Sequence, residues 1–75
     1  MKVMVAAPFE LRGQGRDGCV DLHEGARVRD LLRLAVNAPI YTRLLPVSVN
    51  GEQAKHSQIL QDGDVVVFIL PRTGG

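Results

Sequence analysis

Residues 65–70 read Val65-Val-Val-Phe-Ile-Leu70, a run of apolar and mostly β-branched side chains near the end of the chain. Such residues favour strands, and neighbouring side chains of a strand point to opposite faces of the sheet. A strand that is apolar on both faces is typical of the middle of a sheet. The run follows the turn signal Asp62-Gly-Asp64 and stops at Pro71, which cannot donate a ladder hydrogen bond. It therefore predicts the central strand of the fold.

The clearest helical pattern lies in the middle of the chain. Apolar residues recur there at i, i+3, i+4, i+7 and i+8, namely Val28, Leu31, Leu32, Ala35 and Val36. This spacing places them on one side of a helix with 3.6 residues per turn. Asn37-Ala-Pro39 predicts the end, because the residue before a proline is disfavoured in the helical region. We expect one amphipathic helix over residues 28–36, with its arginines in water.

Three further segments have strand patterns. Lys2–Ala7 is rich in β-branched residues and ends at Pro8, and Cys19–His23 alternates apolar and polar residues. Val47–Asn50 alternates as well and leads into Asn50-Gly51, the strongest short signal for a type I′ hairpin turn. Residues 9–18 are expected to form a loop with room for one helical turn, and residues 57–60 a short turn of helix.

The order of these elements predicts an α+β, β-grasp fold: a mixed sheet with one main helix packed on one face. The right-handed crossover rule allows the last strand to lie parallel beside the first. The expected core on the helix side consists of Val20, Leu22, Val28, Leu31, Leu32, Val36, Val66 and Phe68.

One face of the sheet is expected to stay open, because a single helix covers only one side. Val67 and Ile69 then point away from the helix. An apolar patch on a small domain typically marks an interaction surface. The alternative is that Leu44, Leu45 or the loop beginning at Phe9 folds over this face.

Length, charge and cysteine content exclude several classes of protein. A chain of 75 residues holds one small domain, expected over residues 1–70, with a tail over residues 71–75. A formal charge of +1 is too small to hold a long phosphate backbone, so we expect no nucleic-acid partner. One cysteine rules out a disulfide framework and a multi-cysteine zinc site, and no apolar stretch approaches the roughly 20 residues of a membrane span. We expect a cytoplasmic protein with no metal site and no membrane contact.

The end of the chain, Pro71-Arg-Thr-Gly-Gly75, is expected to form an exposed arm. Its five residues span roughly 17 Å when extended, which is enough to enter another protein's active site. Glycines have no Cβ and can pass through a narrow channel. The reactive group of such an arm is the carboxylate of Gly75. A carboxylate is a poor acyl donor and must first be activated, for instance as an acyl-adenylate that a partner makes from ATP.

Four stretches together resemble the MoaD/ThiS family of ubiquitin-like sulfur carriers. They are Glu24-Gly-Ala-Arg-Val-Arg-Asp-Leu-Leu32, Val49-Asn-Gly-Glu52, Leu60-Gln-Asp-Gly-Asp64 and Pro71-Arg-Thr-Gly-Gly75. The resemblance covers nearly the whole chain. It implies a β-grasp carrier that is not an enzyme and binds no cofactor, whose C-terminal glycine is adenylated by an E1-like enzyme of the MoeB/ThiF type with ATP. It further implies conversion of that glycine to a thiocarboxylate that donates sulfur.

The resemblance also assigns roles to individual residues. Gly75 bears the adenylate and the thiocarboxylate, with Gly74 beside it. The partner-binding residues that it implies are Ala6, Val67, Ile69, Pro71, Arg72 and Thr73. Family members carry aromatic residues on the open face, which this chain replaces with Ala6 and Ile69.

The long segment from Pro8 to Gly18 is similar to that of the molybdopterin-synthase small subunit, so delivery to a sulfur-accepting synthase large subunit is the preferred pathway. Three alternatives stay open: a thiamin-type carrier, a protein modifier joined to lysines through the same C-terminus, and an interaction module with an idle tail. Cys19, His23 and His56 lack the partners that a nucleophile or a metal site requires in sequence.

Overall fold

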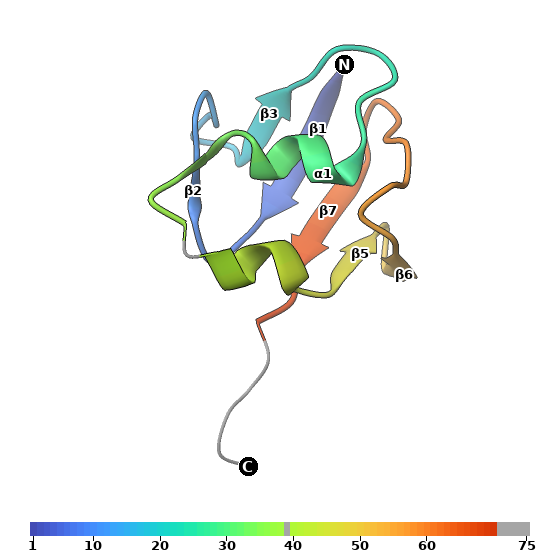
Figure 1. The fold of residues 1–75 in the computed structure, drawn as a ribbon. Helices are drawn as coiled ribbons and strands as arrows, with labels where there is room; N and C mark the ends of the chain where they lie inside the picture. The colour runs from blue at the N-terminus through green and yellow to red at the C-terminus, as the bar shows by residue number, and fades with distance from the viewer. Residues whose placement is uncertain (39, 71–75) are drawn as a thin grey trace.

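Seven short strands, one α-helix and one 3₁₀ helix make up the part of the chain that the computed structural model describes, residues 1–38 and 40–70. In chain order the elements are β1 (Lys2–Ala6), β2 (Glu10–Leu11), β3 (Cys19–Asp21), α1 (Val28–Leu32), β4 (Ala35–Val36), the 3₁₀ helix η1 (Ile40–Leu44), β5 (Val47–Val49), β6 (Glu52–Ala54) and β7 (Val65–Phe68). Figure 1 shows α1 lying across one face of the sheet, with η1 at the edge where β7 ends.

β7 is the central strand of a five-stranded sheet with the order β3-β1-β7-β5-β6. It runs parallel to β1, with Met4 opposite Val65 and Ala6 opposite Val67. It runs antiparallel to β5, where Ser48 lies opposite Val67. The first and last strands therefore lie side by side in the middle of a mixed sheet, as Figure 1 shows, and the predicted β-grasp fold is confirmed.

Two of the predicted turns are present, and side chains tie them together. Asn50 and Gly51 have φ angles of 54° and 85°, the left-handed pair that a type I′ turn requires. Asp64 is buried, and its carboxylate accepts hydrogen bonds from the Asn50 side-chain amide at 2.9 Å and the Gln61 backbone N–H at 2.8 Å. The Val65 N–H donates to Asn50 Oδ1 at 2.9 Å. This network fixes the β5–β6 hairpin against the start of β7.

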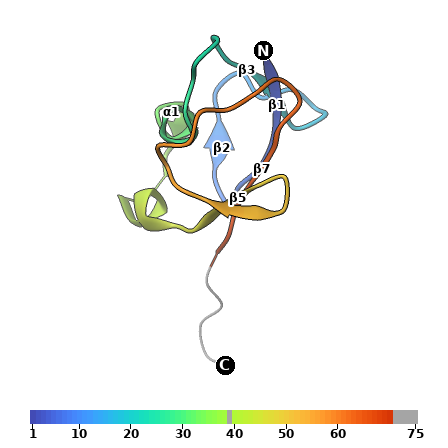
Figure 2. The same cartoon turned by 90° about the vertical axis from the view of Figure 1, so that its right-hand side faces the viewer.

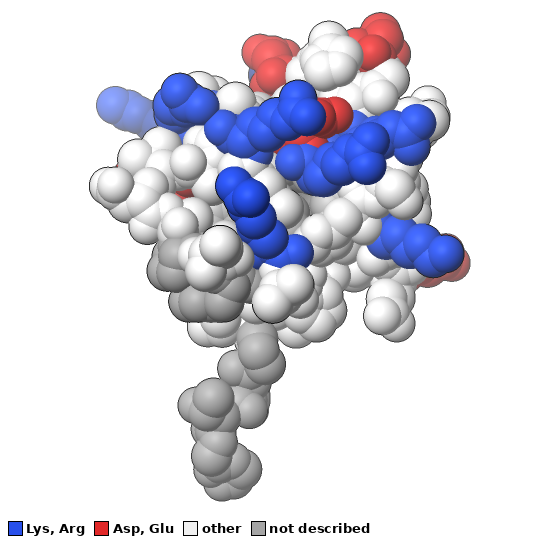
Figure 3. Space-filling model, in the orientation of Figure 1, with Lys and Arg blue, Asp and Glu red and all other residues white. Residues whose placement is uncertain are grey.

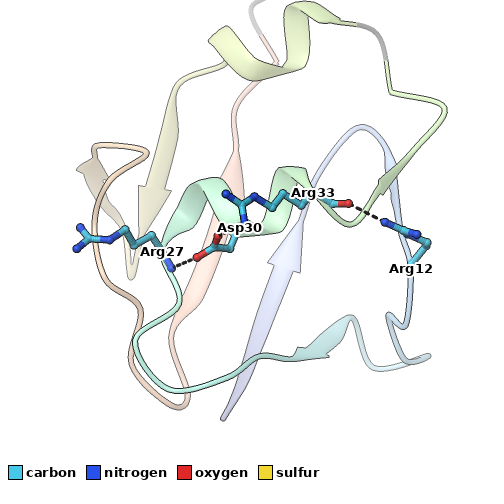
Figure 4. Close-up of polar contacts among 4 residues, drawn as sticks. All are labelled: Arg12, Arg27, Asp30 and Arg33. Atoms are coloured by element: carbon cyan, nitrogen blue, oxygen red, sulfur yellow. Dashed lines mark hydrogen bonds and ion pairs between the residues drawn. The ribbon is translucent and has the colours of Figure 1, made fainter.

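The start of α1 is set by Asp30. The backbone N–H of Arg27 donates to Asp30 Oδ2 at 2.7 Å, and the Asp30 N–H donates to the Arg27 carbonyl at 2.9 Å (Figure 4). The carboxylate thus satisfies a backbone donor that the first turn of a helix leaves unpaired. The same hydrogen bond lowers the pKa of the Asp30 carboxyl.

α1 is shorter than the predicted helix over residues 28–36. It ends at Leu32, and Ala35–Val36 forms β4, which pairs antiparallel with β2. The Leu34 carbonyl accepts the Arg12 N–H at 2.8 Å, so the backbone finds partners outside a helix. Strand pairing overrides the apolar period here because valine is a weak helix former.

Two further local predictions were wrong. Residues 9–18 are not a loop alone, because they contain β2, whose Leu11 is buried in the core. Residues 57–60 form no helical turn, and Ile59 instead makes an isolated bridge to Arg27. Both segments are too short to carry a period of their own, so tertiary partners decide their backbone conformation.

The core lies between the sheet and α1. Its buried members are Val3, Val5, Leu11, Val20, Val28, Leu31, Leu45, Val47, Val49, Leu60, Val66 and Phe68. Of the residues expected on the helix side, Leu22 and Leu32 are half-buried against this cluster. Val36 is half-buried and not part of it, because β4 has turned away from the helical path. Among the described residues, no helix has the length and hydropathy of a membrane span.

Candidate functional site

The face of the sheet opposite α1 carries a row of exposed apolar side chains. Met4, Val65 and Ile69 are 45%, 40% and 46% exposed, Ala6 is exposed and Val67 is half-buried. The strand register places Met4 beside Val65 and Ala6 beside Val67. We call these five residues the open face. Figure 2 shows α1 and η1 on the same side of the sheet and no helix on the other side of its described part.

The structure brings three predicted contact residues together on this face. Ala6 and Val67 are direct neighbours across β1 and β7, and Ile69 follows Val67 on the same side of the chain. The sequence interpretation missed Met4 and Val65. The same alternation that selects Ala6 and Val67 also selects these two residues, so the signal was present in the sequence. The predicted residues Pro71, Arg72, Thr73, Gly74 and Gly75 lie outside the described residues.

The residues that were considered as a cover for the open face lie elsewhere. Leu45 is buried in the core, and Leu44 is 84% exposed on η1. The ring of Phe9 packs edge-to-face against Phe68, with 5.4 Å between ring centroids, on the core side of the sheet. Neither leucine nor Phe9 covers the open face within the part of the chain that the structure describes.

Polar and weakly polar side chains border the open face. Cys19 lies opposite Met4 on β3, and Ser48 lies opposite Val67 on β5. Desolvation raises the pKa of the Cys19 thiol, and the nearby Asp17 carboxylate raises it further. A thiol that is harder to ionise is a weaker nucleophile. Cys19 is accordingly a border residue of the face whose thiol is harder to ionise than a free one.

The end of β7 leads from the open face into the last residues of the chain. Phe68 anchors this strand, since it is buried and its ring also lies 6.3 Å from that of His56, centroid to centroid. The Ile69 N–H donates to the Pro46 carbonyl at 2.8 Å, and Leu70 is 52% exposed. A partner that covers the open face is thereby placed beside the point where residues 71–75 begin.

The histidines do not form a metal centre with other side chains in the described structure. His56 Nε2 lies 2.8 Å from the Leu45 carbonyl oxygen, to which it donates. Within residues 1–38 and 40–70, no group of three or more His, Cys, Asp or Glu side chains is arranged to hold a metal ion.

Comparison with known proteins agrees with this architecture. The chain superimposes on the crystal structure of SAMP1 from Haloferax volcanii with a TM-score of 0.68 and 20% sequence identity, covering 100% of both chains. At this identity the likeness establishes the β-grasp fold. No curated protein sequence matches the chain significantly. The model of the ThiS family matches residues 5–75. Because this match takes in nearly the whole chain, from β1 to its last residue, the protein belongs to the ThiS family.

Proposed function

We propose that this protein is a sulfur carrier that bears a thiocarboxylate on Gly75 and donates its sulfur in the biosynthesis of a molybdopterin-type cofactor. The observation that carries the proposal is the open face on β7, the strand that continues directly into Pro71-Arg-Thr-Gly-Gly75. Membership of the ThiS family supports it. In this proposal the partner enzyme recognises residues 1–70, and the reaction takes place at the end of residues 71–75.

The reaction needs an activating partner, which we propose is an E1-like enzyme of the MoeB/ThiF type. A carboxylate oxygen of Gly75 attacks the α-phosphorus of ATP, and the bond to pyrophosphate breaks. The product is an acyl-adenylate. Hydrosulfide then forms a bond to the carbonyl carbon while the bond to the AMP oxygen breaks, and a proton is released to solvent. The carrier is left with a thiocarboxylate, without any change of oxidation state.

The chain itself contributes recognition and access, and no catalytic side chain. The five residues of the open face offer apolar contact area to the enzyme. Gly74 and Gly75 have no Cβ, so the acyl carbon can be approached closely. ATP is bound by the enzyme in this scheme, and the carrier holds no cofactor of its own.

The preferred recipient is a sulfur-accepting synthase large subunit. The segment between β1 and β3 supports this choice, because it is long in this chain and is similar to that of the molybdopterin-synthase small subunit. β2 within it docks Leu11 into the core, so the segment is part of the folded domain. In the proposal such a subunit contacts the open face and receives the chain end.

Mass spectrometry tests the reaction directly. The full chain is incubated with ATP, sulfide and each E1-like enzyme of its host, and we expect its intact mass to rise by about 16 Da as sulfur replaces oxygen. The control is the chain without Gly75, which should gain no mass. Failure of every host enzyme to produce the mass change contradicts the proposal. So does the finding of Thr-Gly-Gly remnants, which trypsin leaves by cleaving after Arg72, on lysines of other proteins without any thiocarboxylate form.

A further inference from the structure

Arginine side chains gather on the helix side of the molecule, although the net charge of the whole chain is only +1. Figure 3 shows Lys and Arg side chains, in blue, across the face on which α1 lies. We call this group the arginine face; its members are Arg12, Arg27, Arg29, Arg33 and Arg43. The open face lies on the other side of the sheet, so the two surfaces are separate.

Little negative charge compensates these arginines. Among the described residues, one ion pair joins acidic and basic side chains, that of Arg33 with Asp30 at 3.7 Å. The Asp30 carboxylate also accepts the Arg27 N–H, as Figure 4 shows, and the pKa of its carboxyl is lowered. It is already ionised and engaged. Asp21 lines a depression together with Asp30 and Arg33, so two carboxylates lie beside five guanidinium groups and leave most of their charge uncompensated.

Two of the arginines are held in place by backbone oxygens. Arg12 Nη2 donates to the Arg33 carbonyl at 2.8 Å, and Arg27 Nη1 donates to the Ser57 carbonyl at 2.7 Å. These contacts are made to neutral acceptors, so they orient the guanidinium groups without removing their charge. The ends of the arginine face are thus positioned in advance, which lowers the entropy lost when a partner binds.

The centre of the arginine face is hollow. Arg29, Leu32, Arg33, Arg43 and His56 line a depression of about 390 Å³. A second depression of about 270 Å³ adjoins it and shares Leu32 and Arg43. The result is an aliphatic floor at Leu32 with guanidinium groups around it, a combination that suits a ligand with both carboxylates and an apolar side chain.

We propose that the arginine face binds an acidic segment of a partner protein. Arg29 lies in α1 and Arg33 is its C-cap, so these two residues, four positions apart, are neighbours along one side of the helix. Glutamates at positions i and i+4 of a partner helix have the same spacing. Guanidinium groups bind carboxylates through paired hydrogen bonds. An apolar side chain of the same segment rests on Leu32.

A protein segment fits these observations better than a nucleic acid. Three arginines line the hollow and the whole chain has a net charge of only +1, whereas binding along a phosphate backbone uses an extended basic track and a strongly basic domain. The floor at Leu32 is aliphatic, and the one ring among the lining residues, that of His56, is held by its hydrogen bond to the Leu45 carbonyl. Because the arginine face and the open face are on opposite sides of the sheet, the acidic segment binds while the open face is occupied, independently of the proposed sulfur transfer.

Nuclear magnetic resonance titration of the full chain tests the proposal. The probe is a helical peptide with glutamates at i and i+4 and a leucine between them, and the matched peptide carries glutamines instead. We expect the glutamate peptide to shift backbone signals of α1 and η1, and to leave Val65 and Val67 unchanged. The combined variant Arg29→Gln, Arg33→Gln and Arg43→Gln should bind roughly tenfold more weakly, and added salt should weaken the native complex.

The matched control removes three positive charges elsewhere, through Lys2→Gln, Arg16→Gln and Lys55→Gln. It should bind the peptide nearly as well as the native chain. Equal weakening of both combined variants overturns the proposal, because net charge alone would explain binding. Tighter binding of a single-stranded oligonucleotide through the same arginines, or displacement of the peptide by an equal concentration of inorganic phosphate, also overturns it. The single variant Arg43→Gln repeats the test should the combined variant not fold.

Discussion

The substitution Ile69→Asp, which introduces a negative charge at the end of the open face, tests whether the activating enzyme recognises the protein through this face. Ile69 retains 46% of its surface exposed, so a partner on this face removes close to half of the side chain from water. Full burial of an isoleucine is worth about 1.5–3 kcal/mol, and this half is therefore worth about 1 kcal/mol. Ile69→Asp loses that contact and forces a carboxylate against apolar groups, which costs about 2 kcal/mol more. The total of about 3 kcal/mol corresponds to roughly 100-fold weaker binding.

The assay is ATP–pyrophosphate exchange by the host's E1-like enzyme, measured over a range of carrier concentrations. We expect the concentration of Ile69→Asp that gives the half-maximal rate to be roughly 100-fold higher than that of the native chain. The rate at saturation should be unchanged, because Gly75 and its carboxylate are intact. Thermal stability should change little, since the side chain is already half in water.

Ile59→Asp is the matched control. Ile59 is the same residue type and 45% exposed, and it lies beside Arg27, away from the open face. Its half-maximal concentration should stay within about twofold of the native value. A native-like value for Ile69→Asp would refute the reasoning, and so would an equal rise in both variants, because the enzyme would then respond to net charge.

Two predictions concern stability, and both are measured by urea unfolding. Asp64→Ala should lower the free energy of unfolding by about 3 kcal/mol, because Asn50 and Gln61 each lose a charged acceptor. Asp64→Asn keeps one acceptor oxygen and should lower it by less, and a change near zero for Asp64→Ala would show that the two hydrogen bonds contribute nothing. The folded-state pKa of Asp30 lies below the ordinary value of 3.8, so its ionised form stabilises the protein above that pH and the contribution disappears as pH falls through the lowered pKa. The native chain should therefore exceed Asp30→Asn in stability at pH 6 and lose that margin on acidification, whereas a margin that is independent of pH contradicts this assignment.

The central part of the fold was predictable because its signals are local and strong. Alternation over residues 65–70 assigns each side chain of β7 to one face of the sheet. A type I′ turn requires left-handed φ angles at both central residues, and Asn50-Gly51 is a pair that readily adopts them. The open face follows from the same alternation, and the sequence interpretation recovered three of its five members. Val67 and Ile69 follow from the alternation and Ala6 from the family resemblance, whereas Met4 and Val65, which the same alternation selects, were not assigned to the face.

The helix length could not be predicted, since the spacing of Ala35 and Val36 fits a helix and a strand equally well. What decides between them is a partner distant in sequence, the segment Glu10–Leu11, whose backbone pairs with β4. A strand of two residues is too short to show a hydrophobic periodicity in the sequence, so the pairing of β2 with β4 can be recognised only in the folded structure. The arginine face was predictable only in part. The helical pattern places the arginines of α1 in water, but the approach of Arg12 and Arg43 to them depends on tertiary structure, which net charge does not reveal.

The two proposed contact surfaces depend on different forces, which allows them to be separated in one preparation. Binding through the open face rests on apolar burial and should respond weakly to ionic strength. Binding through the arginine face rests on exposed charges and should weaken as the screening length falls from about 10 Å at 0.1 M salt to about 3 Å at 1 M. If the activating enzyme used only the open face, its half-maximal carrier concentration would be insensitive to salt. A steep salt dependence that the charge-removing variants of the arginine face abolish would instead place that enzyme, or a protein acting with it, on both sides of the sheet at once.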